Sequence, residues 1–231
     1  MLKKRTLSLI TATAAALAFA VTAQAASKEL SYSPRVDQIG SNIAGKTVQV
    51  LGEDDWNEWA SFLPGDDPRA VLGFAYPLAD SSSVLYHKIF INPDLWPALS
   101  KAAAGGAESS GASRYLTAVA IMSLTHEAYH QRLTSLDESR VNACALKAFP
   151  DVLDREFGVH PTVSTRKSVA SRVRVRYRVR VNKRWVYRYR WKTVSRTVTS
   201  TGPNSVFQEY VSDAIDFYTH QPAPYNAGTC W

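Results

Sequence analysis

The stretch LTHEAYHQRLTSLDESRVNACALKAF, Leu124–Phe149, decides how the rest of the chain is interpreted. It contains a His-Glu-x-x-His pattern at His126, Glu127 and His130, and Glu138 follows eight residues after the second histidine. Two histidines four residues apart on a helix present their imidazoles on one face. A glutamate next to the first histidine can take a proton from water that a bound metal ion activates. The stretch therefore predicts a zinc site, and the simpler alternative is a helix that carries two surface histidines.

The spacing of apolar residues supports a helix that is buried along one side. One row at four-residue spacing consists of Leu116, Ala120, Leu124 and Ala128, and the histidines border this row. We expect Ser113 to cap the start of this helix. Asp137 is expected to start the next helix, which should end before Pro150. A short turn would then return either Asp137 or Glu138 to the histidines as the third ligand.

The segment from Glu138 to Leu146, ESRVNACAL, resembles the second metal helix of the small gluzincin metallopeptidases. The wider layout also resembles exported actinobacterial proteins with a Thr-His-Glu-x-x-His, Asp-Glu, Cys pattern. The resemblance implies that Glu138 is the third zinc ligand beside His126 and His130, and that Glu127 is the general base. The separation between His130 and Glu138 is shorter than in most gluzincins, so Asp137 stays an alternative ligand.

The same resemblance implies a zincin-like fold and hydrolysis of peptide bonds in a peptide or protein substrate. It implies a small antiparallel sheet beside the active-site helix, with an edge strand that binds substrate by strand addition. The segment 84–91 is the candidate for that strand. No tyrosine or histidine is clearly placed to stabilise an oxyanion, and Tyr210 and His220 are distant candidates.

The order of the other elements indicates an α+β fold, because a few strands precede a cluster of helices. Strands are expected over 47–51, 71–78 and 84–91. Helical segments are expected over 35–44, over 55–63, from Asn92-Pro93 onward and over 205–219, with a loop over 64–68. We expect Val206, Tyr210, Ile215 and Phe217 to form the apolar side of the last helix.

The first 25 residues have the pattern of a secretory signal peptide. Lys3, Lys4 and Arg5 precede a short apolar run, and Ala23-Gln24-Ala25 forms a small-x-small cleavage site. A transmembrane anchor is the alternative, but the run is short for a span. We therefore expect residues 26–231 to form one domain that is secreted or extracytoplasmic, with no transmembrane anchor after cleavage.

The chain has two cysteines, Cys144 and Cys230. An even pair in an oxidising compartment indicates a disulfide. This bond would tie the end of the chain to the segment just after the metal motif.

The net charge of +7 conceals two opposite parts. The expected leader holds 3 of the 27 basic residues, and the stretch 166–196 holds 13 basic and no acidic residues. The remainder has 11 basic and 20 acidic residues, a net charge of −9. The protein is therefore predicted to be an acidic body with a very basic insert over 166–201.

Within this insert, apolar or aromatic residues alternate with basic ones, which predicts a β-hairpin. A two-residue turn at Asn182-Lys183 would pair Arg180 with Trp185 and create a cation–π face. A three-residue loop would pair Val181 with Trp185 and separate a valine–aromatic face from an arginine face. We favour the three-residue loop, because it avoids burying arginine beneath the hairpin.

Arginine outnumbers lysine in the insert by 10 to 3, which favours bidentate contacts with anions. The candidate contact residues are Arg174, Arg176, Arg178, Arg180, Arg188 and Arg190. Their partner is expected to be an anionic cell-envelope polymer or nucleic acid. The alternatives are the acidic body of the same chain, or no partner at all.

Taken together, these patterns predict an exported zinc metallopeptidase with one disulfide and a basic hairpin. The alternative is a catalytically silent envelope-binding or scaffold protein that keeps the fold and binds an anionic polymer through its hairpin.

Overall fold

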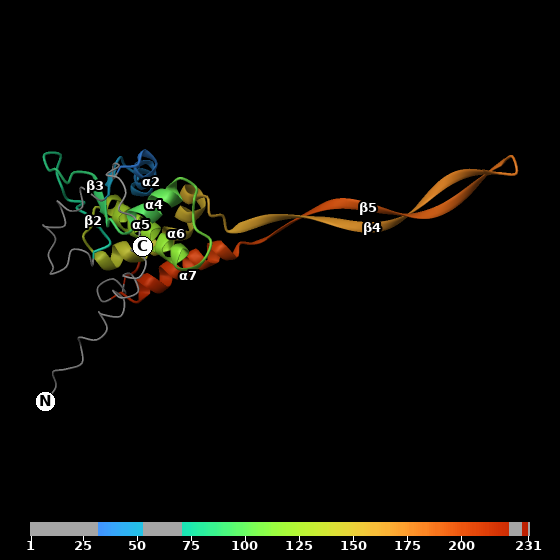
Figure 1. The fold of residues 1–231 in the computed structure, drawn as a ribbon. Helices are drawn as coiled ribbons and strands as arrows, with labels where there is room; N and C mark the ends of the chain where they lie inside the picture. Colours follow the sequence, from blue (N-terminus) through green and yellow to red (C-terminus); the bar gives the residue numbers. More distant parts are fainter. Residues whose placement is uncertain (1–31, 53–70, 222–227, 231) are drawn as a thin grey trace, which may run out of the picture. The chain divides into compact units, whose positions relative to one another are not determined.

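The computed structural model describes residues 32–52, 71–221 and 228–230 (Figure 1). The expected leader, the helical turn over 55–63 and the loop over 64–68 lie outside the described residues. The helices are α2 (Pro34–Ala44), α4 (Trp96–Ala103), α5 (Gly111–Leu133), α6 (Glu138–Phe157) and α7 (Ser205–Thr219). The strands are β1 (Gln49–Leu51), β2 (Gly73–Ala75), β3 (Lys88–Ile91), β4 (Thr162–Val181) and β5 (Arg184–Pro203). The fold is mixed α+β, as the sequence predicts.

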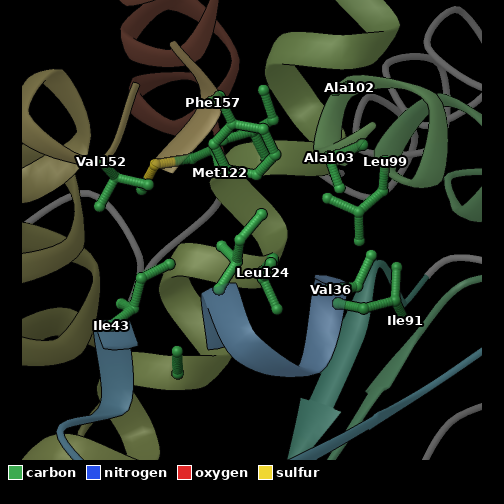
Figure 2. Close-up of a cluster of buried hydrophobic side chains, with 14 of the residues drawn as sticks. Val36, Ile43, Ile91, Leu99, Ala102, Ala103, Met122, Leu124, Val152 and Phe157 are labelled. Carbon is green, nitrogen blue, oxygen red and sulfur yellow. The ribbon is translucent and has the colours of Figure 1, made fainter. Parts of the chain in front are cut away.

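Helix α5 is the centre of the core, because it packs against α2, α4, α6, α7, β2 and β3. It is buried on nearly every side from Thr117 to Gln131. Figure 2 shows apolar side chains converging on it, among them Val36 from α2, Leu99 from α4 and Phe157 from α6. Such a helix is held in place by its neighbours, which makes it a rigid support for a site.

Helix α2 follows its sequence signals closely. The Ser33 side chain accepts a hydrogen bond from the Val36 backbone amide, Pro34 occupies the first turn, and Gly45 ends the helix at φ 69°. Glycine suits this left-handed position because it has no Cβ. Asp37 also accepts a hydrogen bond from the backbone amide of Val50 at 2.7 Å, which joins α2 to β1.

The small sheet has the order β1-β3-β2, with β1 parallel and β2 antiparallel to β3. The expectation of an antiparallel sheet is therefore wrong for β1. The segment 84–91 is also not an edge strand: only Lys88–Ile91 is extended, and it is the middle strand. His87 has φ 54°, which interrupts the extended chain before Lys88. Among the described strands of this sheet, β1 and β2 lie at the edges.

Two helix starts differ from the expected ones. Asn92 begins a turn whose carbonyl accepts from the amides of Leu95 and Trp96, and α4 begins only at Trp96. Helix α5 begins at Gly111, so Ser113 lies inside it and is not its cap. Gly111 has φ 64°, a conformation that glycine adopts without strain.

Helix α6 begins where the sequence predicts, but it continues through Pro150 to Phe157. Proline lacks one backbone donor, and in α6 the apolar side continues past it with the buried residues Val152, Leu153 and Phe157. Burial of that side outweighs the lost hydrogen bond.

The bounds of α7 match the expected 205–219. Its buried side, however, consists of Tyr210, Ala214 and Tyr218, whereas Ile215 is exposed. This pattern follows the spacing of four residues, which places Ile215 on the next side of the helix.

Strands β4 and β5 form a separate two-stranded hairpin, which spans Thr162–Pro203. Arg180 pairs with Trp185 and Arg178 pairs with Tyr187, so the turn contains two residues and the favoured three-residue loop is wrong. Asn182 and Lys183 have φ values of 46° and 63°, as a type I′ turn requires. This turn matches the natural twist of two antiparallel strands, which explains why it forms.

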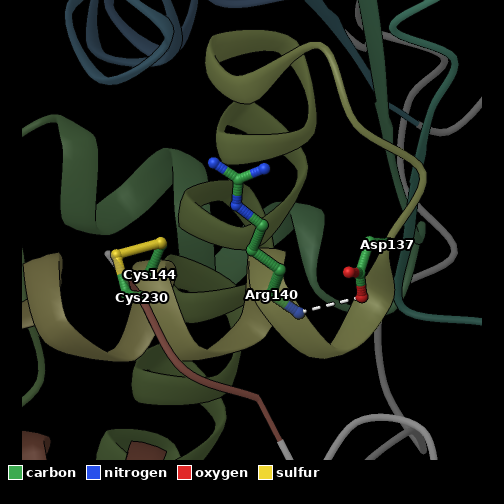
Figure 3. Close-up of a disulfide and its surroundings, with 4 residues drawn as sticks. All are labelled: Asp137, Arg140, Cys144 and Cys230. Carbon is green, nitrogen blue, oxygen red and sulfur yellow. Dashed lines mark hydrogen bonds between the residues drawn. A yellow bond between two sulfur atoms is a disulfide. The ribbon is translucent and has the colours of Figure 1, made fainter.

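Cys144 and Cys230 form the expected disulfide, with 4.7 Å between their Cα atoms (Figure 3). It links the middle of α6 to the last described residues. In the described part of the chain, no helix combines the length and the apolar character that crossing a membrane requires.

Candidate metal centre

Helix α5 brings the two histidines of the motif together in the interior. His126 and His130 are only 4% and 3% exposed, and their Nε2 atoms are 3.1 Å apart. The residues lie one turn apart, so both imidazoles reach the same point beside the helix. The alternative of two surface histidines is therefore wrong.

The turn after α5 returns the chain to this point. Thr134 ends α5 in the left-handed conformation, and α6 starts at Glu138. Glu138 Oε2 lies 3.0 Å from His126 Nε2 and 3.3 Å from His130 Nε2. Asp137 instead caps α6, where its side chain accepts from the Arg140 amide at 3.1 Å (Figure 3). Of the two acidic candidates, Glu138 is the one that meets the histidines.

The same turn fixes the orientation of His130. Its Nδ1 lies 2.7 Å from the carbonyl oxygen of Ser135. A carbonyl can only accept a hydrogen bond, so Nδ1 carries the proton and Nε2 is left to face His126 and Glu138. Carbonyl groups commonly orient metal-binding histidines in this way.

The three ligand atoms have a spacing that suits a small metal ion. Their separations are 3.0, 3.1 and 3.3 Å. Nitrogen and oxygen atoms at about 2.0–2.1 Å from a tetrahedral zinc ion are about 3.3 Å from one another. The residues His126, His130 and Glu138 can therefore hold a metal ion with little rearrangement.

Glu127 is buried next to this group, with 7% of its surface exposed. A backbone hydrogen bond from Ala75 in β2 reaches it. Gly73 in the same strand leaves room for the side chain: a Cβ atom there would lie 2.7 Å from Glu127 Cγ. Burial raises the pKa of Glu127, against the opposing charges of His126 and His130. A carboxylate with a raised pKa is a better proton acceptor near neutral pH.

The metal-free group is held together by its own charges. Burial alone would lower the pKa of His130, but the hydrogen bond with Glu138 and the charges of Glu127 and Glu138 raise it to about 9. Burial would likewise raise the pKa of Glu138, but hydrogen bonds with both histidines hold it at about 2. At neutral pH, His130 and Glu138 therefore form an ion pair, which keeps the ligand atoms close together.

Tyr218 lies near His126 and was not singled out for the site from sequence. The rings of Tyr218 and His126 have centroids 5.9 Å apart, and the Tyr218 hydroxyl lies 3.3 Å from Ser123 Oγ. Tyr218 thus joins α7 to the motif helix. Tyr218 follows Tyr210 and Ala214 at four-residue spacing, and this spacing could have predicted that it lies on the buried side of α7.

The two distant candidates for oxyanion stabilisation are not at the site. The Tyr210 hydroxyl donates to the Glu108 carbonyl at 2.6 Å, and Nδ1 of His220 lies 2.6 Å from the Asp216 carbonyl oxygen on the surface. Both groups already have partners away from the histidines. Tyr210 and His220 thus have no part in the candidate metal centre.

The start of α6 is braced by the end of the chain. Gly228 lies so close to Ser139 that an added Cβ would be 1.8 Å from the Ser139 carbonyl oxygen. Two residues later, Cys230 is bonded to Cys144 on the same helix. The terminal segment therefore packs directly beside the residue that follows Glu138.

The hairpin arginines are divided between its two faces. One face carries Arg174, Arg176, Arg178 and Arg180 together with the aromatic residues of β5, and the other face carries Arg188 and Arg190.

Comparison of the chain with protein-family models, curated proteins and solved structures gave no match.

Proposed function

We propose that the protein is an exported zinc-dependent hydrolase that cleaves peptide bonds. The observation that carries the proposal is the convergence of His126, His130 and Glu138, with Glu127 buried beside them. Two imidazoles and one carboxylate are a ligand set that suits catalytic zinc, because a fourth position stays available. The match between the ligand spacing and zinc geometry supports this metal over larger ions.

The residues of the chain have distinct tasks in such a reaction. His126, His130 and Glu138 would hold the zinc ion, which when bound polarises a carbonyl group and makes water more acidic. Glu127 accepts the proton that the attacking water loses and delivers it to the departing amine. Strand β2 holds the Glu127 carboxylate in place: Gly73 leaves space for the side chain, and the Ala75 backbone forms a hydrogen bond with it.

A peptide substrate is supported by the position of β2. This strand lies at one edge of the described sheet, and its Gly73 and Ala75 are next to Glu127. An extended peptide can add to such an edge through its backbone, which would place a peptide bond near the base. The proposal assigns this role to β2, in place of the segment 84–91.

Export is supported by two observations on different parts of the chain. Residues 1–25 have the composition of a cleavable leader. The Cys144–Cys230 disulfide suits an oxidising compartment.

The function is tested with the protein lacking residues 1–25, a broad peptide library and the Glu127→Gln variant. We expect cleavage by the wild type and a loss of at least about a hundredfold in the variant, with zinc content unchanged, because only proton transfer is removed. Glu108→Gln is the matched control, since Glu108 pairs with Lys101 on the surface. A zinc-loaded wild type that cleaves no peptide would reject hydrolysis and favour a silent binding protein.

A further inference from the structure

The hairpin of β4 and β5 is a long, positively charged and exposed ribbon. Its 42 positions from Thr162 to Pro203 contain 13 basic and no acidic residues. Both faces are exposed along the strands: only Val175, Tyr177, Val179 and Gly202 are partly covered. Neither face is thus used for packing within the described part of the chain.

The register and the ion pairs bear on how the hairpin is used. A three-residue loop would have produced one wholly apolar face, suited to burial or to a membrane surface. The observed two-residue turn mixes basic and apolar side chains on both faces. Within the described residues, moreover, the ion pairs of the structure include no lysine or arginine of the hairpin. In the described part of the chain, no acidic side chain of the body is paired with a hairpin cation.

One face combines guanidinium groups with aromatic rings in a regular array. This arginine–aromatic face consists of Arg174, Arg176, Arg178, Arg180, Trp185, Tyr187, Tyr189 and Trp191. The guanidinium carbons of Arg174 and Arg176 lie 4.3 and 3.9 Å from the ring centroids of Tyr189 and Tyr187. Arg178 lies 5.4 Å from the rings of both Trp185 and Tyr187.

These contacts leave much of each aromatic residue available. Trp185, Tyr187, Tyr189 and Trp191 are 59%, 51%, 52% and 64% exposed. A cluster of exposed large apolar side chains marks an interaction surface. A partner with both negative charges and flat apolar groups would satisfy the two kinds of side chain together.

We propose that the arginine–aromatic face binds single-stranded nucleic acid. Arginines contact the phosphates, and bases stack on the rings, as in other surfaces that bind single strands without sequence preference. Residues on one face of a strand repeat about every 6.7 Å. Phosphates of a stacked strand in duplex DNA repeat about every 3.4 Å along the axis, so the face fits an extended strand with its bases spread apart.

This binding site is independent of the proposed metal centre, because the hairpin contains none of the candidate ligands. The probe is a fluorescent thymidine oligonucleotide of about 20 nucleotides, titrated with the protein lacking residues 1–25. We expect the affinity to fall steeply with salt. In a plot of the logarithm of the binding constant against the logarithm of the salt concentration, each phosphate contacted adds about −0.7 to the slope. Duplex DNA of equal length should bind more weakly, since its bases cannot reach the rings.

Two sets of variants separate charge from stacking. Changing Arg174, Arg176, Arg178 and Arg180 together to Gln should weaken binding at least tenfold and flatten the salt slope by about 2–3. Changing Trp185, Tyr187, Tyr189 and Trp191 together to Leu should weaken binding at least about tenfold with the slope retained. Replacing the same four residues by Phe keeps the rings and should change affinity less than about threefold. Replacing Arg184, Arg188, Arg190 and Lys192 by Gln removes equal charge from the opposite face of the hairpin and should have the smaller effect.

Several outcomes would overturn the proposal. One is the absence of oligonucleotide binding at about 50 mM salt, a concentration low enough for phosphate contacts to be strong. Another is binding of base-free polyphosphate or of anionic phosphatidylglycerol vesicles as tight as that of the oligonucleotide. If the Leu variant does not fold, a Phe variant that binds no better than the arginine variant would equally reject stacking.

Discussion

Gly73 leaves the space that the Glu127 side chain occupies. An alanine there would place Cβ 2.7 Å from Glu127 Cγ, so the glutamate side chain must move. We expect Gly73→Ala to lower peptide hydrolysis at least about tenfold, because a small displacement of a catalytic group is costly. Zinc content should be unchanged, since His126, His130 and Glu138 are untouched.

Gly202→Ala is the matched control, because nothing lies within 4 Å of a Cβ at Gly202. Hydrolysis rates and zinc content of both variants are the measurement. Full activity in Gly73→Ala would show that β2 does not hold the base.

His130 should make metal binding depend on pH. Its raised pKa of about 9 means that a metal ion must displace a proton at neutral pH. We expect release of about one proton from His130 at pH 7–8, and affinity that rises with pH up to about 9. Calorimetry in buffers of different ionisation enthalpy measures this release. His160→Gln, which removes an exposed histidine, should leave it unchanged, whereas zinc binding without proton release would contradict the ion pair.

The same ion pair has a defined effect on the stability of the metal-free protein. The pKa of His130 is raised from 6.5, the value of an unperturbed histidine, to about 9 in the folded protein. The resulting stabilisation is fully present below about pH 6.5 and is lost as the pH rises through about 9. The lowered pKa of Glu138 stabilises the fold above about 4.5, and this contribution is lost as pH falls through about 2. Metal-free stability from this pair is therefore greatest between about pH 4.5 and 6.5.

Helix α6 depends on the terminal segment for its position. The Cys144–Cys230 bond closes a loop with a sequence separation of 86 residues. The chain-entropy model gives about 4–5 kcal/mol for a loop of this size. Changing both cysteines to Ser should lower the unfolding free energy by up to that amount and weaken zinc binding, because Gly228 no longer braces Ser139 beside Glu138. Equal zinc affinity in the two proteins would show that this brace is not needed.

The hairpin turn offers a test of register at the level of the element. Lys183 has φ 63°, a conformation that costs a side chain about 1 kcal/mol and glycine almost nothing. Lys183→Gly should therefore stabilise the hairpin by about 1 kcal/mol. Cross-strand nuclear Overhauser contacts should join Arg178 to Tyr187. Contacts that join Val179 to Tyr187 would instead establish the three-residue loop.

The elements differ in how far local sequence determines them. Helices α2 and α7 carry their own caps, Ser33 and Asn204, so their bounds were predictable. Pro150 was misleading as a helix end. Other elements of the core bury Leu153 and Phe157, and this burial outweighs the tendency of proline to end a helix. The order of β1, β3 and β2 depends on contacts between distant segments, which no local pattern contains. In the hairpin, both registers satisfied the same alternation, and the choice rested on turn geometry.

The candidate site was predictable where its residues are close in sequence. His126, Glu127, His130 and Glu138 belong to two consecutive helices, and helical spacing brings them together. Gly73 and Tyr218 come from β2 and α7, far along the chain. Their roles depend on packing against α5, which only the folded structure supplies.

We expect the hairpin to be separable from the rest of the chain. Asn204 donates from its backbone to the Pro161 carbonyl at 2.9 Å and from its side chain to the His160 carbonyl at 2.8 Å. The two ends of the hairpin are therefore adjacent, and a short Gly/Ser link can replace residues 166–201. We expect this deletion to leave zinc content and hydrolysis within about twofold of the full chain, while oligonucleotide binding is lost. Loss of zinc on deletion would show that the two parts are coupled.

The proposed function depends on the binding of one metal ion by His126, His130 and Glu138. Its most direct test is elemental analysis of the purified protein lacking residues 1–25, beside His126→Ala, His130→Ala and the control His160→Gln. We expect about one zinc per chain in the wild type and the control, and almost none in the His126 and His130 variants. Zinc at full occupancy in those two variants, or no bound metal in the wild type after incubation with zinc, would contradict it.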